Sequence, residues 1–447
     1  MNKNSRRSRR RKWHDSAHAS LCLLGWYLRH VGFLTRLAEG VTIGQKILKY
    51  SSAQKIVMLF ASLLAGVKAV AHTGLTLRVD RALQAAFGLP GCAEQSVIAD
   101  TLDAATGEDV AALRALVAAQ FRRHSQTRRH DLTKTMLVLD LDLSPLPTSR
   151  KCEGAERGYF GRCRSKTGRK LVRVRAADYD ELVWEDVVGG KTAETLPVLQ
   201  AAVEAIERLL GLAGEGEDTP VKRARVEWRL DSGWGSEEML NWLLERGYQV
   251  TGKFKSPSRV KKLVRDITAW QPTSSPGREA APVPTPVALA KPTHQYAVRT
   301  PSKEQACGFY YAVLVSTRDD LTMPATVDHY DGRAGIEAEI KADKHGLALA
   351  TIRKHKLAAQ QLVILLMELA HNVLIWSRRW LAPHAPHLAG CGIVRLIQEV
   401  WAIPGRVKLV DGEPLHFRLK REHPRARDLV SGFRPLLLSS QSLAFLG

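Results

Sequence analysis

The sequence predicts an α/β protein, in which a mixed sheet with flanking helices is interrupted by a β-rich insertion and preceded by an all-α N-terminal domain. Helical patterns fill the first part of the chain, strand and helix patterns then alternate, and a proline-rich stretch precedes a final helical segment. These changes place a domain at 1–130, a second at 131–385 with its insertion at about 255–324, and a basic C-terminal region at 386–447.

The N-terminal domain is predicted to be helical throughout. A breaker at Gly88–Gly91 precedes a short helix at Gln95–Leu102, and Thr106 with Asp109 forms a capping-box pattern at the start of the next helix. A short helix, a tight turn and a second helix are compatible with a helix-turn-helix DNA-binding motif and equally with a plain helical bundle. The arginine-rich run at 6–12 favours DNA, although a charged run is more often a solvated surface.

Composition and charge narrow the partners. The chain has 66 Lys and Arg against 45 Asp and Glu, a net charge of +21, which favours a polyanion such as nucleic acid. Six scattered cysteines, with no C-x-x-C pair, argue against a disulfide scaffold and a zinc finger. The most apolar stretch, Ile56 to Ala71, is interrupted by Lys68 and is predicted to be a buried helix. We therefore expect a cytoplasmic, nucleoid-associated protein without a membrane partner.

The central segment predicts alternating strands and helices. Met136–Leu143 is almost continuously apolar, which is typical of a strand buried on both faces. The elements expected after it are strands at 171–175 and 182–188, a helix at 195–212, a strand at 225–231, a helix at 236–246 and a strand at 248–254. Three strands, helix, strand, helix, strand is the order of elements in an RNase H-like fold, where the first and fourth strands are neighbours.

Acidic residues stand at two of these strands. Asp140 and Asp142 lie two apart on the first strand, so both side chains leave the same face, and Asp231 ends the fourth. Each aspartate alone could simply end a strand and cap the following turn. On neighbouring strands, however, they would point into one cleft. Burying carboxylates among Leu and Val is costly unless a partner compensates them.

A third acid lies in the late helical segment. Tyr330, Arg333, Glu337, Lys341 and Lys344 follow one another at steps of three, four, four and three, so they would share one face of a helix. Glu337 is the only acid of this stripe and is expected to stay ionised between its cationic neighbours. An exposed helix with salt bridges is the alternative.

Three carboxylates suit phosphoryl transfer on DNA. Magnesium prefers oxygen ligands, and two ions held by shared carboxylates can stabilise the attacking and leaving oxygens of an in-line displacement. We expect two Mg²⁺ ions, with Mn²⁺ as a substitute. Nearby cations would neutralise the phosphate.

The pattern Tyr330-x2-Arg333-x3-Glu337-x6-Lys344 resembles the signature of bacterial insertion-sequence DDE transposases. The segments 139–144 and 230–234 are similar to the strands that carry the first and second aspartates in that family. The resemblance covers roughly residues 130 to 385. Ser144 is a mild departure, because the family often has Thr at that position.

The resemblance implies Asp142, Asp231 and Glu337 as metal ligands and catalytic residues. It implies that Tyr330, Arg333 and Lys344 contact the transferred DNA strand, with Lys341 beside them, and that a tryptophan of the insertion, here Trp270, stacks on a flipped base. Asp140 stays an alternative to Asp142 as the first ligand; Asp142 is preferred because it lies nearer the strand end.

The function expected is that of a transposase that cleaves and transfers DNA strands at the inverted-repeat ends of an insertion sequence. Its partners would be double-stranded DNA, both terminal repeats and target, and a second copy of itself in a homodimeric DNA complex. The alternatives are an inactive or domesticated DNA-binding protein derived from such an element and an RNase H-like repair nuclease.

Overall fold

The computed structural model describes residues 11–46, 49–158, 160, 166–214, 216, 218–305 and 307–439. Most of the arginine-rich run, residues 6–10, and Cys163 lie outside this part. The chain divides into two compact units. We call residues 125–150 and 154–340 the sheet unit, and residues 1–124, 151–153 and 341–447 the helical unit. The predicted mixed α/β composition is confirmed.

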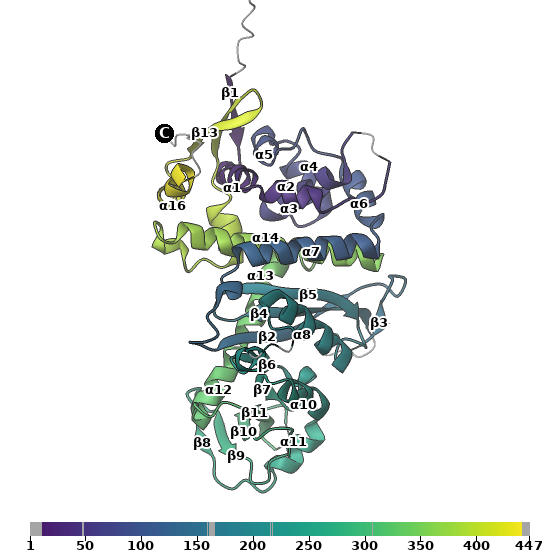
Figure 1. Ribbon diagram of the computed structural model, residues 1–447, viewed down its shortest axis with the longest axis vertical. Helices are drawn as coiled ribbons and strands as arrows, with labels where there is room; N and C mark the ends of the chain where they lie inside the picture. The colour runs from purple at the N-terminus through teal and green to yellow at the C-terminus, as the bar shows by residue number, and fades with distance from the viewer. Residues whose placement is uncertain are drawn as a thin grey trace, which may run out of the picture. The chain divides into compact units, whose positions relative to one another are not determined.

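The sheet unit is built on a ten-stranded mixed sheet (Figure 1). Its strands are β2 (Leu137–Pro147), β3 (Glu156–Arg157), β4 (Thr167–Ala176), β5 (Glu181–Gly189), β6 (Val226–Leu230), β7 (Gln249–Lys253), β8 (Gln271–Pro272), β9 (Glu279–Pro282), β10 (His294–Pro301) and β11 (Phe309–Ser316). They follow the order β3-β4-β2-β6-β7-β11-β10-β9-β8, and β5 also pairs with β4.

The middle of this sheet follows the expected order of elements. β4 runs antiparallel to both β5 and β2, whereas β2, β6 and β7 are parallel to one another. The predicted pairing of the first and fourth strands is confirmed as β2 with β6. Apolar side chains of both strands, such as Leu139, Leu141 and Trp228, are fully buried, which explains the near-continuous apolar run.

Helices connect the strands of the sheet unit. They are α8 (Leu196–Leu210), α9 (Thr219–Arg223), α10 (Glu237–Glu245), α11 (Pro257–Val264), α12 (Met323–Asp331), the start of α13 (Ala334–Gly346), and the 3₁₀ turns η2 (Thr127–Arg129) and η3 (Ser232–Trp234). α8 and α10 are the two predicted connecting helices. Ser236 caps α10 as expected, because its hydroxyl accepts a hydrogen bond from the Met239 N–H.

The proline-rich residues 271–292 of the insertion contribute strands to the sheet. β8 and β9 lie within that stretch and extend the same sheet, with β9 paired to β10 and β10 to β11. Ala280 and Ala281 are buried. Prolines are tolerated at the ends and edges of sheets, so a proline-rich composition did not exclude short strands there.

The helical unit combines the N-terminal helices with the last third of the chain. Its helices are α1 (Ala19–His30), α2 (Phe33–Glu39), α3 (Ser52–Leu64), α4 (Thr73–Thr76), α5 (Arg81–Ala86), α6 (Gln95–Asp103), α7 (Gly107–His124), α14 (Leu357–Leu381), α15 (Ile393–Arg395) and α16 (Ala426–Ser439), with the end of α13 and the short turns η1 (Val70–His72), η4 (Pro386–Leu388) and η5 (Leu396–Val400). The expected buried helix near Ile56 is α3, and the Thr106–Asp109 contact at the start of α7 is present.

Two features of the helical unit correct the sequence-based expectation. The N-terminal part is not all-α, because β1 (Arg11–Ser16) pairs with β12 (Gly405–Val410), which also pairs with β13 (Glu413–Leu419) (Figure 1). A strand whose partner lies almost at the other end of the chain gives little local signal. The predicted boundary near residue 385 also differs from the observed division, since α14 packs on α3, α6 and α7.

α14 is the one helix of the described residues that is long and apolar enough to cross a membrane by length and composition. Its most apolar window is 89% buried inside the protein. A core helix of a soluble protein passes the same test, so the length of α14 is explained by its packing.

Candidate active site

The first two predicted acids lie at neighbouring strand positions. The last paired residues of the parallel strands β2 and β6 are Leu141 and Leu230, and Asp142 and Asp231 follow them directly. Asp231 also caps the turn that follows its strand, because its Oδ1 accepts a hydrogen bond from the Ser232 N–H at 2.6 Å. One oxygen of Asp231 therefore caps the turn, which was the alternative role considered for it. This role is compatible with its position beside Asp142 on the neighbouring strand.

Asp142 occupies an unfavourable environment for a carboxylate. It is 8% exposed, and burial raises its pKa from 3.8 to about 6. The positive charge of Arg333 opposes this rise, whereas the negative charges of Asp231 and Glu337 add to it. All three predicted acids therefore act electrostatically on one another in the sheet unit.

Arg333 is the cation on which these acids converge. Its Nη1 lies 3.4 Å from Asp142 Oδ1, and its Nη2 lies 2.5 Å from Glu337 Oε1. Asp142, Asp231, Glu337 and the neighbouring Tyr330 all raise the pKa of Arg333, against the effect of burial. Arg333 and Tyr330 are almost fully buried, whereas the Glu337 side chain is 57% exposed.

The predicted single helical stripe is corrected. Tyr330 belongs to α12 and Glu337 to α13, and Arg333 lies in the break between the two helices. Gly332 and Arg333 lie between the two helices, and Glu337 lies in the first turn of α13. Lys341 and Lys344 follow Glu337 on α13, which passes from the sheet unit into the helical unit between Ile340 and Lys341.

Asp140, the alternative first ligand, is occupied by arginines. Its Oδ1 lies 2.6 Å from Arg229 Nε, and its Oδ2 lies 2.9 Å from Arg229 Nη2 and 3.3 Å from Arg175 Nη1. Its side chain is fully buried. Such a carboxylate is already compensated on both oxygens, which favours Asp142 over Asp140 for binding anything else.

Lys253 belongs to the site but was not predicted. It ends β7, the third parallel strand, and the charge of Asp231 raises its pKa while burial, the larger effect, lowers it. The backbone of Lys253 lies close to Gly235, because a Cβ at position 235 would meet the Lys253 carbonyl oxygen at 1.7 Å. The available signal was positional: the carboxyl ends of parallel strands meet at one edge of a sheet.

A pocket of about 340 Å³ opens beside this edge. Its walls combine basic and aromatic side chains, namely Lys253, Lys255, Lys261, Phe309, Tyr310 and Tyr311, with Ser232 next to Asp231. The Lys253 Nζ lies 5.6 Å from the centre of the Tyr330 ring and 6.0 Å from that of Tyr310. Cations beside aromatic faces suit a ligand with phosphates and planar bases.

Trp270 lies next to an aromatic residue of this pocket. Its ring centre is 5.9 Å from that of Tyr311, and the Arg299 guanidinium carbon lies 4.5 Å from the Trp270 ring centre. The tryptophan is therefore a neighbour of the pocket through Tyr311, with one face already covered by a guanidinium.

The carboxylate oxygens of the three acids are suitable ligands for a divalent cation, but their positions in the structure fit one less well. They supply carboxylate oxygens, which Mg²⁺ prefers, and their mutual repulsion at Asp142 would be relieved by positive charge. Among the residues that the structure describes, however, no three His, Cys, Asp or Glu side chains lie close enough together to hold a metal ion. A metal would have to compete with Arg333 for Glu337.

Comparisons with known proteins leave the family open. No protein-family model matches the chain, and no curated protein matches it in sequence. A solved structure, described as the piggyBac transposase synaptic complex with hairpin DNA, aligns with a TM-score of 0.48 and 10% sequence identity over 87% of this chain and 82% of that one. Similarity at this level assigns the chain to no family, so its function has to be inferred from its own residues.

Proposed function

We propose that the protein is a DDE-type DNA transposase that cleaves and transfers DNA strands at the inverted-repeat ends of a mobile element. The observation that carries this proposal is the electrostatic convergence of Asp142, Asp231 and Glu337 on one buried arginine. Glu337 pairs with Arg333 locally, at i,i+4, whereas Asp142 and Asp231 are far away in the sequence and act on Arg333 only through the tertiary structure. Their match to the Y-x2-R-x3-E-x6-K pattern supports the insertion-sequence type of transposase.

The sheet supports an RNase H-like catalytic core. The order β5-β4-β2-β6-β7, with three antiparallel strands followed by two parallel ones, is the arrangement that this fold requires. The strands from β8 to β11 would then form the β-rich insertion between the second aspartate and the glutamate. Asp142 and Asp231 directly follow the last paired residues of the neighbouring strands β2 and β6, which suits the first two acids of an RNase H-like core.

Metal ions would enter at the three carboxylates. Asp142, Asp231 and Glu337 would hold two Mg²⁺ ions, or Mn²⁺ in their place, which supply Lewis acidity and an activated oxygen nucleophile when bound. Arg333 and Lys253 would bind the phosphate near the reacting bond, and Tyr330 would position the strand against them. Burial around Asp142 keeps bulk water away and strengthens each of these charge interactions.

DNA is the proposed partner. Lys253, Lys255 and Lys261 give the pocket beside the site a positive wall, and Tyr310 and Tyr311 offer faces on which an unpaired base can stack. Trp270 would take part through Tyr311. Lys341 and Lys344 would extend the cationic track along α13. Because two element ends have to be joined, we propose a homodimer in the DNA complex, acting in the cytoplasm on nucleoid DNA.

A cleavage assay tests the proposal. The substrate is a duplex that carries an inverted repeat flanking the gene for this chain, incubated with the full-length protein and Mg²⁺ or Mn²⁺. We expect metal-dependent nicking at the repeat end by the wild type and none by Asp231→Asn or Glu337→Gln. Glu238→Gln is the matched control, because Glu238 is an exposed acid on α10 of the same unit. This variant should cleave at the wild-type rate.

Each other result selects a different function. Binding of the repeat without cleavage in either metal would identify a DNA-binding protein derived from a transposase. Cleavage that ignores the repeat would identify an RNase H-like nuclease of repair. Full cleavage by both Asp231→Asn and Glu337→Gln would show that the acids do no chemistry, and the proposal would be wrong.

A further inference from the structure

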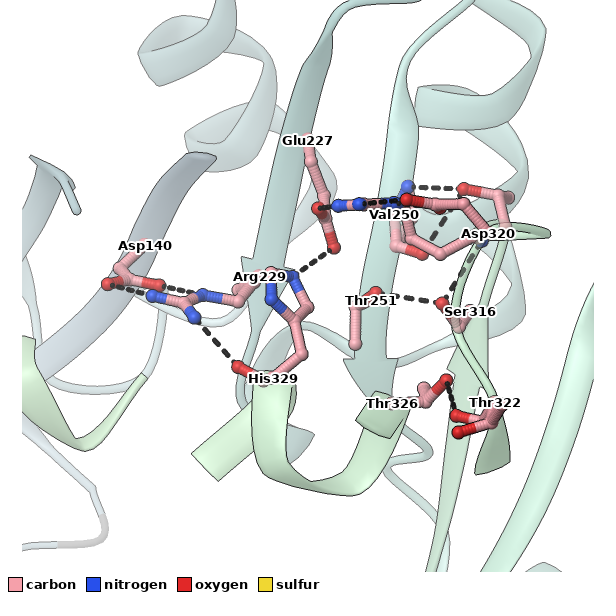
Figure 2. A network of polar contacts seen from close by, with 12 residues as sticks. Asp140, Glu227, Arg229, Val250, Thr251, Ser316, Asp320, Thr322, Thr326 and His329 are labelled. Carbon is pink, nitrogen blue, oxygen red and sulfur yellow. Dashed lines mark hydrogen bonds and ion pairs between the residues drawn. The ribbon is translucent and has the colours of Figure 1, made fainter. Parts of the chain in front are cut away.

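One buried guanidinium links the two strands of the first two acids to α12, the helix that precedes Arg333 and Glu337. Arg229 lies on β6, two residues before Asp231, and it is only 5% exposed. Two of its nitrogens bind Asp140 on β2, two residues before Asp142. Its third nitrogen, Nη1, donates to the main-chain oxygen of His329 on α12 at 2.7 Å, as Figure 2 shows.

The chain at the end of α12 is shaped around this arginine. A Cβ at Gly332 would meet Arg229 Nη1 at 2.7 Å, so a side chain there would push the guanidinium away. Gly332 is the residue between α12 and Arg333, and its φ of −55° would suit alanine equally well. A side chain at position 332 would therefore be opposed by the closeness of Arg229 and not by the backbone conformation.

Further contacts hold both sides of the α12–α13 break. The His329 ring Nε2 lies 2.8 Å from Glu227 Oε1, on the same strand as Arg229, and Figure 2 shows Glu227 between that ring and the neighbouring strand. On the other side of Asp140, Arg175 Nε donates to Glu339 Oε1 at 2.6 Å. Glu339 lies two residues after Glu337 on α13.

We propose that Arg229, with Asp140 as its counter-ion, is a positioning residue that sets the distance of Arg333 and Glu337 from Asp142 in β2 and from Asp231 directly after β6. The inference rests on the proposed function. A planar guanidinium can satisfy three acceptors in fixed directions, whereas a lysine ammonium cannot hold a carboxylate in a bidentate pair and a carbonyl in the same geometry. A change of about 1 Å in a reacting group can lower a rate about 10²-fold.

The experiment compares Arg229→Lys with Arg246→Lys. Arg246 is the matched control, because it also forms a bidentate pair with a buried carboxylate of the sheet unit, Glu207, at 2.7 and 2.6 Å. Cleavage at saturating repeat DNA and affinity for that DNA are measured for both. We expect Arg229→Lys to cleave about 10²-fold more slowly with unchanged DNA affinity, and Arg246→Lys to keep the wild-type rate.

A second pair of variants leaves every charge in place. Gly332→Ala displaces Arg229 by contact and should slow cleavage, whereas Gly107→Ala, at a glycine with nothing within 4 Å of an added Cβ, should not. In protein that already carries Arg229→Lys, Gly332→Ala should lower the cleavage rate much less than it does in the wild type, because the two substitutions act on one contact.

Hydrogen exchange gives a readout that does not depend on activity. Amides of residues 323–340 should exchange faster in Arg229→Lys than in the wild type or Arg246→Lys. If wild type cleaves and both Arg229→Lys and Gly332→Ala cleave equally well, with unchanged exchange, the positioning role is refuted while the proposed function stands. If the wild type does not cleave, the proposed function is wrong. If, in addition, residues 323–340 exchange equally fast in the wild type and in Arg229→Lys, the contact of Arg229 does not hold this segment in place either.

Discussion

Asp140 and Asp142 leave the same strand two residues apart, and their surroundings differ completely. Three guanidinium N–H groups from Arg229 and Arg175 compensate both oxygens of Asp140. Asp142 has one ion pair, with Arg333 at 3.4 Å, and two further acids act on it. Burial is costly for any carboxylate, and of these two Asp140 has the more complete set of cationic partners to offset that cost.

The difference favours a structural role for Asp140 and the proposed binding role for Asp142. Charged groups that are buried with incomplete compensation cluster at functional sites. A cation brought from solution, or the DNA with its counter-ions, would complete the environment of Asp142. The comparison therefore predicts opposite responses of the two aspartates to substitution.

The largest effect is expected on cleavage by Asp142→Asn. Removing one member of a group of residues that act together lowers a rate by about 10⁴-fold or more. The measurement is single-turnover nicking of repeat-end DNA, and far-ultraviolet circular dichroism confirms that the variant is folded. If Asp142→Asn cleaves within tenfold of the wild-type rate, Asp142 does not have the catalytic role that separates it from Asp140.

Asp140→Ala should instead lower the free energy of unfolding of the sheet unit. Losing this acid leaves the buried Arg229 guanidinium without its carboxylate partner, whereas Arg175 keeps Glu339, and an unpaired buried charge costs about 3–5 kcal/mol of unfolding free energy. Urea denaturation of the metal-free protein measures the change. A cost below about 1 kcal/mol would mean that solvent or other acids replace Asp140.

Asp142→Asn should stabilise the metal-free protein near pH 7.5. Because the pKa of folded Asp142 is raised from 3.8 to about 6, its ionised form costs the folded state about 3 kcal/mol at most above pH 6. The wild type regains this stability as the pH falls through 6 towards 4. The advantage of the variant in urea denaturation should therefore be largest at pH 7.5 and disappear near pH 4; an advantage independent of pH would contradict the assignment.

The smallest effect is expected from magnesium. Mg²⁺ at ten times its dissociation constant should stabilise the wild type by about 1.4 kcal/mol, because it binds only the folded state. Thermal unfolding should show this shift in the wild type and in Glu238→Gln and lose it in Asp231→Asn. An equal shift in all three proteins would place the metal elsewhere.

Local pattern was enough to predict the elements of the sheet unit. The apolar run of β2, the alternation of β6 and the capped start of α10 follow from short-range periodicity and capping, and all three are present. Local pattern failed where partners are distant in sequence. β1 pairs with β12, and the late helical stripe is interrupted at Gly332 and Arg333, where Arg229 of a distant strand lies close to Gly332.

The sequence by itself determined which acids could matter, since Asp142, Asp231 and Glu337 have the types and neighbours that phosphoryl transfer needs. Only the tertiary structure showed that Asp140 is already paired with two arginines, which favours Asp142, and that Lys253 and Arg229 lie near these acids. The physical reason is that a residue's chemistry is local, whereas its compensation depends on charges that distant strands bring to it.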